Sequence, residues 1–207
     1  MTTLITTPGL PPALPGLLPY RLSVDQYEAM IDAGILAETN RLELIEGLIV
    51  EKDVKKPVHS GAGEGARRVI ERALPAGWHT RGEQPIRIPN RDSEPEPDIS
   101  VARGTVHDYL DHHPGPPDIA LVVEAARTSI AADRALAPTY AGGGIPVYWI
   151  LNIVDRQLEI YLGPGEKGYV IQMTLLEMES VDLLIEDRVV ARIPVADLLP
   201  PRPQDAH

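Results

Sequence analysis

Residues Ile119 to Glu124, with the sequence IALVVE, decide the fold because they join a continuous apolar run to a terminal carboxylate. Five consecutive apolar residues are typical of a strand that is buried on both faces of a sheet. An unpaired buried carboxylate costs several kcal/mol, so Glu124 needs either a partner or a metal ion. The run therefore predicts a central strand that carries a paired or functional acid.

A second acid, Asp98, opens another predicted strand, Asp98 to Ala102, directly after Pro97. If this strand adjoins the first one, the two carboxylates lie together at one edge of the sheet. Mg²⁺ commonly takes one or two protein carboxylates, with waters and a substrate phosphate at its remaining positions. Asp98 and Glu124 meet that minimum.

The residues alone leave two alternatives open. In the first, Asp98 caps a loop and Glu124 pairs with Arg127 or Arg134. In the second, a different loop binds a softer metal ion, because imidazole nitrogens are common ligands of zinc. That loop carries three histidines and two acids: His107, His112, His113, Asp108 and Asp111.

Outward from these strands, hydrophobic periodicity and turn residues predict the other elements. The expected helices cover 24–30 behind a Ser23 N-cap and ending near Gly34, 58–74, 129–141 before three glycines, and one turn at 195–199. The expected strands are two within 42–51 around Glu46-Gly47, one at 78–88, a hairpin of 147–153 with 157–162, and strands near 169–176 and 181–192. Loops are expected at 89–96 and 107–118.

At 207 residues the chain suits one domain, 20–199, between a proline-rich arm, 1–19, and a loose tail, 200–207. It contains no cysteine, which excludes thiolate chemistry and fits a reducing cytoplasm. We see neither a signal peptide nor an apolar run of about 20 residues, so we expect a cytoplasmic protein without membrane contact. The net charge of -11 argues against sequence-blind nucleic-acid binding, although bound divalent cations offset part of it.

Several short motifs, in this order, resemble the Uma-type family of the PD-(D/E)xK nuclease superfamily, over roughly residues 20 to 200. They are Arg41 to Gly47 (RLELIEG), His59 at a helix start, Gln84 to Ile86 (QPI), Glu96 to Asp98 (EPD), Val122 to Glu124 (VVE), and Tyr140-Ala141 ahead of Gly144 to Ile150 (GIPVYWI).

The resemblance implies an α/β (α+β) fold of the restriction-endonuclease type, with a mixed central sheet flanked by helices and additional antiparallel strands on the C-terminal side. It implies Mg²⁺ or Mn²⁺ held by Asp98 and Glu124, with Glu43 and Gln84 completing a site that hydrolyses DNA phosphodiester bonds. It also implies a homodimer and no organic cofactor. In the alternative interpretation, Glu43 lies at the end of a strand and forms a salt bridge to an arginine.

One departure from the family matters for activity. The usual lysine lies two residues after the second acid or on the following helix, where this chain has Ala126 and Leu136. The chain's lysines are Lys52, Lys55, Lys56 and Lys167, and none lies on that helix. Arg127 or Arg134 supplies positive charge but cannot act as a base. The alternatives to a nuclease are therefore a degenerate relative that binds nucleic acid or protein, and a purely structural module.

Overall fold

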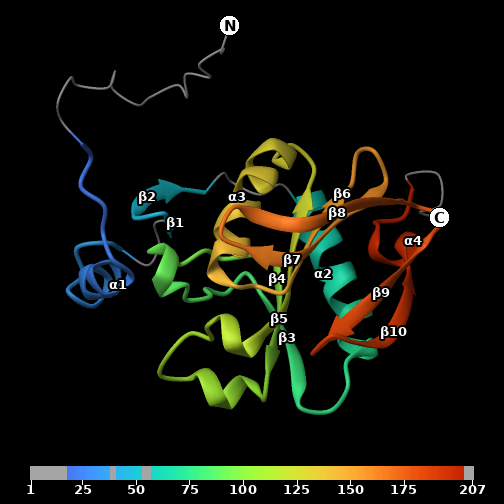
Figure 1. The fold of residues 1–207 in the computed structure, drawn as a ribbon, viewed down its shortest axis with the longest axis horizontal. Helices are drawn as coiled ribbons and strands as arrows, with labels where there is room; N and C mark the ends of the chain where they lie inside the picture. Colours follow the sequence, from blue (N-terminus) through green and yellow to red (C-terminus); the bar gives the residue numbers. More distant parts are fainter. Residues whose placement is uncertain (1–17, 38–40, 53–56, 203–207) are drawn as a thin grey trace, which may run out of the picture.

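A mixed six-stranded sheet forms the centre of the fold (Figure 1). Only β5 and β6 pair in parallel, and every other neighbouring pair is antiparallel. All eight residues of β5 are buried, so the predicted central strand is confirmed. In spatial order the strands are β3 (Trp78–Gly82), β4 (Ile99–Arg103), β5 (Ile119–Ala126), β6 (Val147–Asn152), β7 (Gln157–Gly165) and β8 (Gly168–Leu176).

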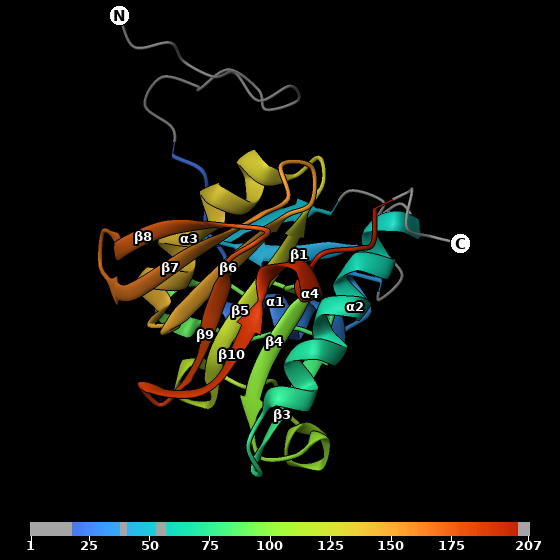
Figure 2. The ribbon, with the colours of Figure 1, turned by 90° about the vertical axis from the view of Figure 1, so that its right-hand side faces the viewer.

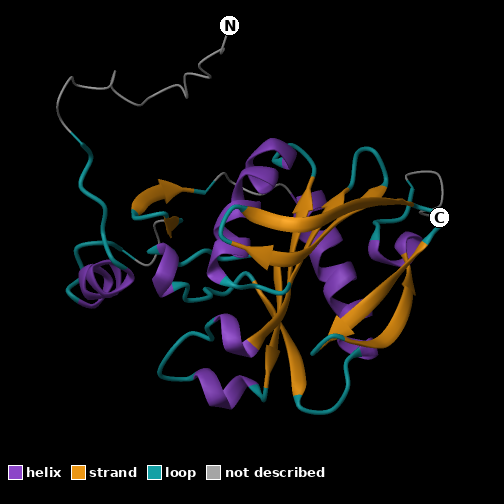
Figure 3. Ribbon diagram, viewed as in Figure 1, coloured by secondary structure: helices purple, strands orange, loops and turns teal. Residues whose placement is uncertain are grey.

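The computed structural model describes residues 18–37, 41–52 and 57–202, with the backbone alone for 57–60. Figure 3 shows the helices and two antiparallel hairpins around the sheet. The helices are α1 (Val24–Asp32), α2 (Pro57–Ala73), α3 (Ile130–Gly143) and α4 (Val195–Leu198), with 3-10 turns η1 (Pro89–Arg91), η2 (Val106–Tyr109) and η3 (Pro116–Asp118). The hairpins are β1 (Leu42–Ile45) with β2 (Leu48–Glu51), and β9 (Ser180–Ile185) with β10 (Arg188–Pro194).

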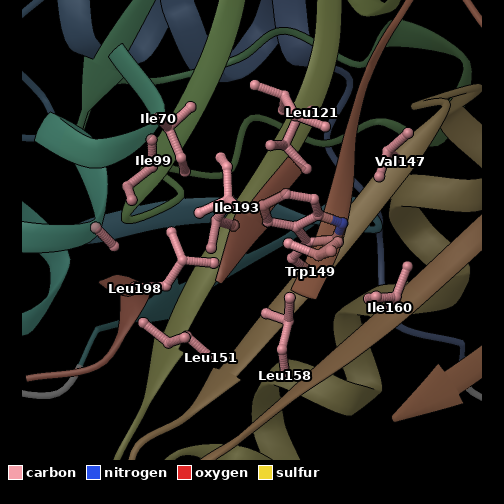
Figure 4. Packing of buried hydrophobic residues seen from close by; sticks show 14 of the residues in the cluster. Ile70, Ile99, Leu121, Val147, Trp149, Leu151, Leu158, Ile160, Ile193 and Leu198 are labelled. Carbon is pink, nitrogen blue, oxygen red and sulfur yellow. The ribbon is translucent and has the colours of Figure 1, made fainter. Parts of the chain in front are cut away.

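The two faces of the sheet build separate hydrophobic clusters, because successive side chains of a strand point to opposite sides. Val123 belongs to the first cluster and Val122 to the second. The first cluster joins the sheet to α2, α4 and the β9–β10 hairpin, around Trp149 (Figures 2 and 4). The second joins the sheet to α3, with Tyr140 and Tyr148 fully buried.

The predicted helix boundaries follow from local chemistry. Oγ of Ser23 accepts a hydrogen bond from the Gln26 amide at 3.2 Å, which confirms the expected N-cap of α1. Helix α3 ends at Gly143, two residues later than expected. Its C-cap is Gly144, whose φ of 89° is a left-handed conformation that glycine adopts without strain.

The expected strand from Trp78 to Ile88 is wrong beyond Gly82. Pro85 has no N–H to donate to a ladder. The amides that follow find acceptors in other loops: Ile86 donates to the Pro95 carbonyl at 3.0 Å, and Arg87 to the Pro114 carbonyl at 2.9 Å. The segment therefore leaves the sheet and wraps around its edge.

Two further expectations need correction. Strand β5 continues to Ala126, so Glu124 lies inside the strand and not at its end. The region 181–192 is a hairpin and not one strand, because Glu186 and Asp187 take positive φ values of 50° and 60° that reverse the chain.

Parts of the predicted arm and tail, 1–17 and 203–207, lie outside the described residues. Leu18 and Pro19, the described end of the arm, are exposed and belong to no helix or strand. None of the helices within the described ranges has the length and apolar character needed to cross a membrane.

Candidate active site

Asp98 and Glu124 meet where β4 begins. The antiparallel register pairs Ile99 with Val123, which places Asp98 beside Glu124 on the neighbouring strand. The Asp98 amide donates to Oε2 of Glu124 at 3.2 Å, and the Ala125 amide donates to Oδ2 of Asp98 at 2.7 Å. Both acids are buried, with 8% and 7% of their surface exposed. The expected meeting of the two acids is confirmed.

Helix α3 supplies a further partner for Glu124. The Tyr140 hydroxyl donates to Oε1 of Glu124 at 3.0 Å. Burial, and after it the negative charge of Asp98, raises the pKa of Glu124 well above its usual range, while the positive charge of Lys52 opposes the rise. Two buried carboxylates on directly paired positions of neighbouring strands favour a bound cation that would relieve their repulsion.

Glu43 lies on β1 and pairs with a lysine rather than with an arginine. Nζ of Lys52 is 2.7 Å from Oε1 of Glu43, and the same oxygen accepts a hydrogen bond from the Glu96 amide at 2.7 Å. Lys52 also donates to the Glu96 carbonyl. These contacts attach Glu43 and Lys52 to the segment that leads into Pro97 and Asp98.

The family's lysine was expected on α3, so the sequence did not point to Lys52 at the end of the β1–β2 hairpin. The register of the β1–β2 hairpin pairs Glu43 with Val50, and the Lys52 amide donates to the Arg41 carbonyl at 2.7 Å. Glu43 and Lys52 are therefore diagonal neighbours on one face, a spacing at which long side chains meet. The predicted turn at Glu46-Gly47 is the sequence feature that could have indicated this diagonal spacing of Glu43 and Lys52.

Apolar contacts fill the positions where the family's lysine was expected. Ala126 is 1% exposed within the second cluster, and Leu136 packs against the same cluster. Arg134 forms a double contact with Glu159, with Nε to Oε2 at 3.0 Å and Nη2 to Oε1 at 2.5 Å. Arg127 is exposed. The alternative in which Glu124 pairs with either arginine is wrong, since Glu124 accepts from Tyr140 and Asp98.

An open cavity of about 410 Å³ adjoins Asp98 on the outer side of β3. Gln84 is exposed and lines this cavity, so the structure brings it to the same site as Asp98. The lining residues come from α2, β3 and the segments next to them, and are Gly63, Glu64, Arg67, Thr80, Arg81, Gly82, Glu83, Gln84, Asp98 and Val106.

The acidic and imidazole side chains of the described residues were the candidate metal ligands. No group of three or more His, Asp or Glu side chains among them is arranged to hold a metal ion. In the histidine-rich loop, Nδ1 of His112 lies 2.7 Å from Oδ1 of its neighbour Asp111. The described residues of this loop form no group of three or more side chains that could hold a metal ion. The oxygen pair of Asp98 and Glu124 thus remains the better fit to a hard divalent cation.

Comparisons with known proteins agree with this geometry. The family model Uma2, described as a putative restriction endonuclease, matches residues 24–193. The fold is similar to a crystal structure of a putative nuclease belonging to DUF820 from Anabaena variabilis, with a TM-score of 0.64 and 17% sequence identity. That similarity covers 86% of this chain and 97% of the other, and at this identity it shows the fold alone. No curated protein matches the chain.

Proposed function

The chain belongs to the Uma2 family of putative restriction endonucleases, and on this premise we propose that it is a metal-dependent nuclease that hydrolyses DNA phosphodiester bonds. The observation that carries the proposal is the buried pair of Asp98 and Glu124, held together by backbone amides beside an open cavity. Family and fold support a nuclease, while the metal ion and the DNA substrate are inferred from the chemistry of this pair.

The donor set fits Mg²⁺ or Mn²⁺, because both ions prefer oxygen ligands and need few from the protein. Asp98 and Glu124 would hold the ion, which when bound supplies Lewis-acid activation of water and of the scissile phosphate. The same ion would offset part of the net charge of -11 where the DNA approaches.

The remaining contacts hold the two acids in place. The Ala125 amide orients Asp98, while the Asp98 amide and the Tyr140 hydroxyl orient the two oxygens of Glu124. Side chains fixed in this way lose little freedom when the substrate binds, which favours catalysis by preorganisation.

Lys52 supplies the positive charge that the family's usual lysine would otherwise bring. Glu43 and the Glu96 carbonyl fix the Lys52 ammonium on the side from which Asp98 enters the sheet. A fixed cation stabilises negative charge that develops on a phosphate in the transition state. We assign Glu43 the role of positioning Lys52.

The test is cleavage of plasmid and single-stranded DNA in the presence of Mg²⁺ or Mn²⁺. We expect cleavage by the wild type and a loss of about 100-fold or more in Asp98→Ala and Glu124→Ala. Glu166→Ala removes an exposed carboxylate from the β7–β8 turn and serves as a control that retains activity. Cleavage that survives both site variants would show that the site is elsewhere.

A second candidate function is binding of nucleic acid or protein without cleavage. The observation that favours it is the apolar surroundings of Ala126 and Leu136, where the family's lysine was expected. The two functions separate in the same experiment combined with calorimetry. Intact DNA together with no Mn²⁺ binding would favour the degenerate protein, whereas Mn²⁺ binding that Asp98→Ala abolishes supports the metal site.

A further inference from the structure

Arg81 on β3 is a buried cation with few compensating contacts. The residue is only 6% exposed, and its Nε has no hydrogen-bond partner in the described part of the chain. Nη2 reaches the Pro85 carbonyl at 3.4 Å, a long contact, and the guanidinium carbon lies 5.4 Å from the centre of the Tyr109 ring. Neither contact supplies a full negative charge.

Such an arrangement needs a physical explanation. An arginine stays protonated at neutral pH, and burying its charge without an anionic partner costs several kcal/mol. The other arginine of the cavity, Arg67, shows the contrast, because it forms two hydrogen bonds with Glu64 at 2.8 and 3.0 Å. Within the described residues Arg81 forms no ion pair of that kind, so its guanidinium has capacity for an external anion.

The position of Arg81 connects it to the proposed metal pair. Arg81 pairs with Ser100 in the sheet register, and Ser100 lies two residues beyond Asp98. Arg81 and Asp98 therefore belong to the same face of the sheet, about 7 Å apart along the strands and about 5 Å across them. Both residues line the cavity of about 410 Å³, as does Gln84, whose side-chain amide is a neutral donor.

We propose that Arg81 binds a backbone phosphate of the nucleic-acid substrate next to the one that is cleaved. This inference rests on the proposed function and adds to it the site that positions the strand. The guanidinium offers several donors in one plane, which matches the oxygens of a phosphate. The cavity opens beside Asp98, so a phosphate held by Arg81 places the neighbouring phosphodiester at the acids.

The first experiment uses inorganic phosphate as the probe. We expect phosphate to raise the melting temperature of the wild type and of Arg68→Gln, but not that of Arg81→Gln. Arg68 is the matched control because it is exposed on α2, pairs with Glu64 and does not line the cavity. Equal stabilisation of all three proteins would overturn the inference.

The second experiment measures binding of a short labelled DNA, with EDTA present so that no metal-dependent cleavage occurs. Replacing Arg81 by Gln should weaken binding about tenfold and reduce the slope of log K against log salt by about 1, while Arg68→Gln keeps the wild-type slope. Arg81→Lys keeps the charge and should keep the slope, which separates phosphate contact from a folding defect.

The outcomes distinguish the two proposals. Phosphate stabilisation through Arg81 without any DNA binding would overturn the assignment to a nucleic-acid backbone. DNA binding through Arg81 in a protein that never cleaves DNA would overturn the proposed nuclease and leave the phosphate site in place. An unchanged salt slope in Arg81→Gln would overturn the phosphate site even if cleavage is confirmed.

Discussion

At the scale of single residues, the proposed site depends on Lys52. Its ammonium lies between a buried carboxylate and a backbone carbonyl, and its charge acts on Glu124 across the site. Glu43 is 7% exposed and, among the described residues, also accepts from the Glu96 amide. The pair therefore contributes both to the stability of this corner and to its electrostatics.

Replacing Lys52 by Met should lower DNA cleavage by about 100-fold, because the fixed cation is lost. The free energy of unfolding should fall by about 2 kcal/mol, since a buried carboxylate loses its charged partner. Lys52→Arg keeps the charge and should retain most of the stability and part of the activity. Cleavage assays and urea denaturation measure the two effects.

Metal binding separates an electrostatic role of Lys52 from a purely structural one. Removing a cation near Asp98 and Glu124 should leave Mn²⁺ binding equal to that of the wild type or tighter, as measured by calorimetry. A Lys52→Met protein that has lost Mn²⁺ binding along with its stability would show that the residue only supports the fold.

At the scale of elements, the β1–β2 hairpin carries Glu43 into the site, and its tip is fixed at both sides. Oε1 of Glu46 accepts from Nη2 of Arg91 at 2.6 Å and from the Thr139 hydroxyl at 2.8 Å. The next residue, Gly47, has a φ of 75° and lies against the segment before α1. The hairpin thus depends on contacts with η1, with α3 and with the segment just before α1.

Gly47→Ala should destabilise the protein by about 2 to 3 kcal/mol, because a left-handed backbone costs a non-glycine residue about 1 to 2 kcal/mol and a clash adds to it. An added Cβ would lie 2.6 Å from the Cβ of Arg21. Gly163→Ala is the matched control: its φ is 69°, but the nearest atom, in Val170, is 3.5 Å away. Equal losses for the two variants in urea denaturation would argue against the clash.

At the scale of the whole molecule, the two faces of the sheet are covered by different elements, although α2 of the first cluster also lines the cavity. The β9–β10 hairpin and α4 cover the first cluster. Glu124 lies on the opposite side of β5, the side of Val122 and the second cluster. Figure 1 shows this C-terminal hairpin on the side of α2 and away from the β1–β2 hairpin. Stability and activity should therefore respond to different substitutions.

Leu183→Ala should cost about 3 kcal/mol of unfolding free energy, because Leu183 is fully buried in the first cluster and its loss leaves a cavity. Leu184→Ala, at a partly buried neighbour, should cost less. Below its melting temperature the Leu183 variant should cleave DNA at the wild-type rate. A loss of cleavage in a folded Leu183→Ala protein would contradict the separation of the two faces.

The sequence by itself determined the central strand and most of the helices, and its resemblance to the family implied that Asp98 and Glu124 share one site. These features depend on local pattern: five apolar residues require burial on both faces, and a carboxylate beside them requires a partner. The order of the short motifs along the chain also indicated the family. The turn at Glu46-Gly47 was predicted, but the hairpin register that brings Glu43 and Lys52 to one face came from the structure.

Only the tertiary structure decided which charges meet across the molecule. It placed Lys52 near Glu124, paired Arg134 with Glu159, and left Arg81 buried beside the cavity. These contacts join residues far apart in the chain, and side-chain spacing along one element does not determine them. The end of β3 at Gly82 was decided in the same way, because the amides beyond Pro85 take their acceptors from distant loops.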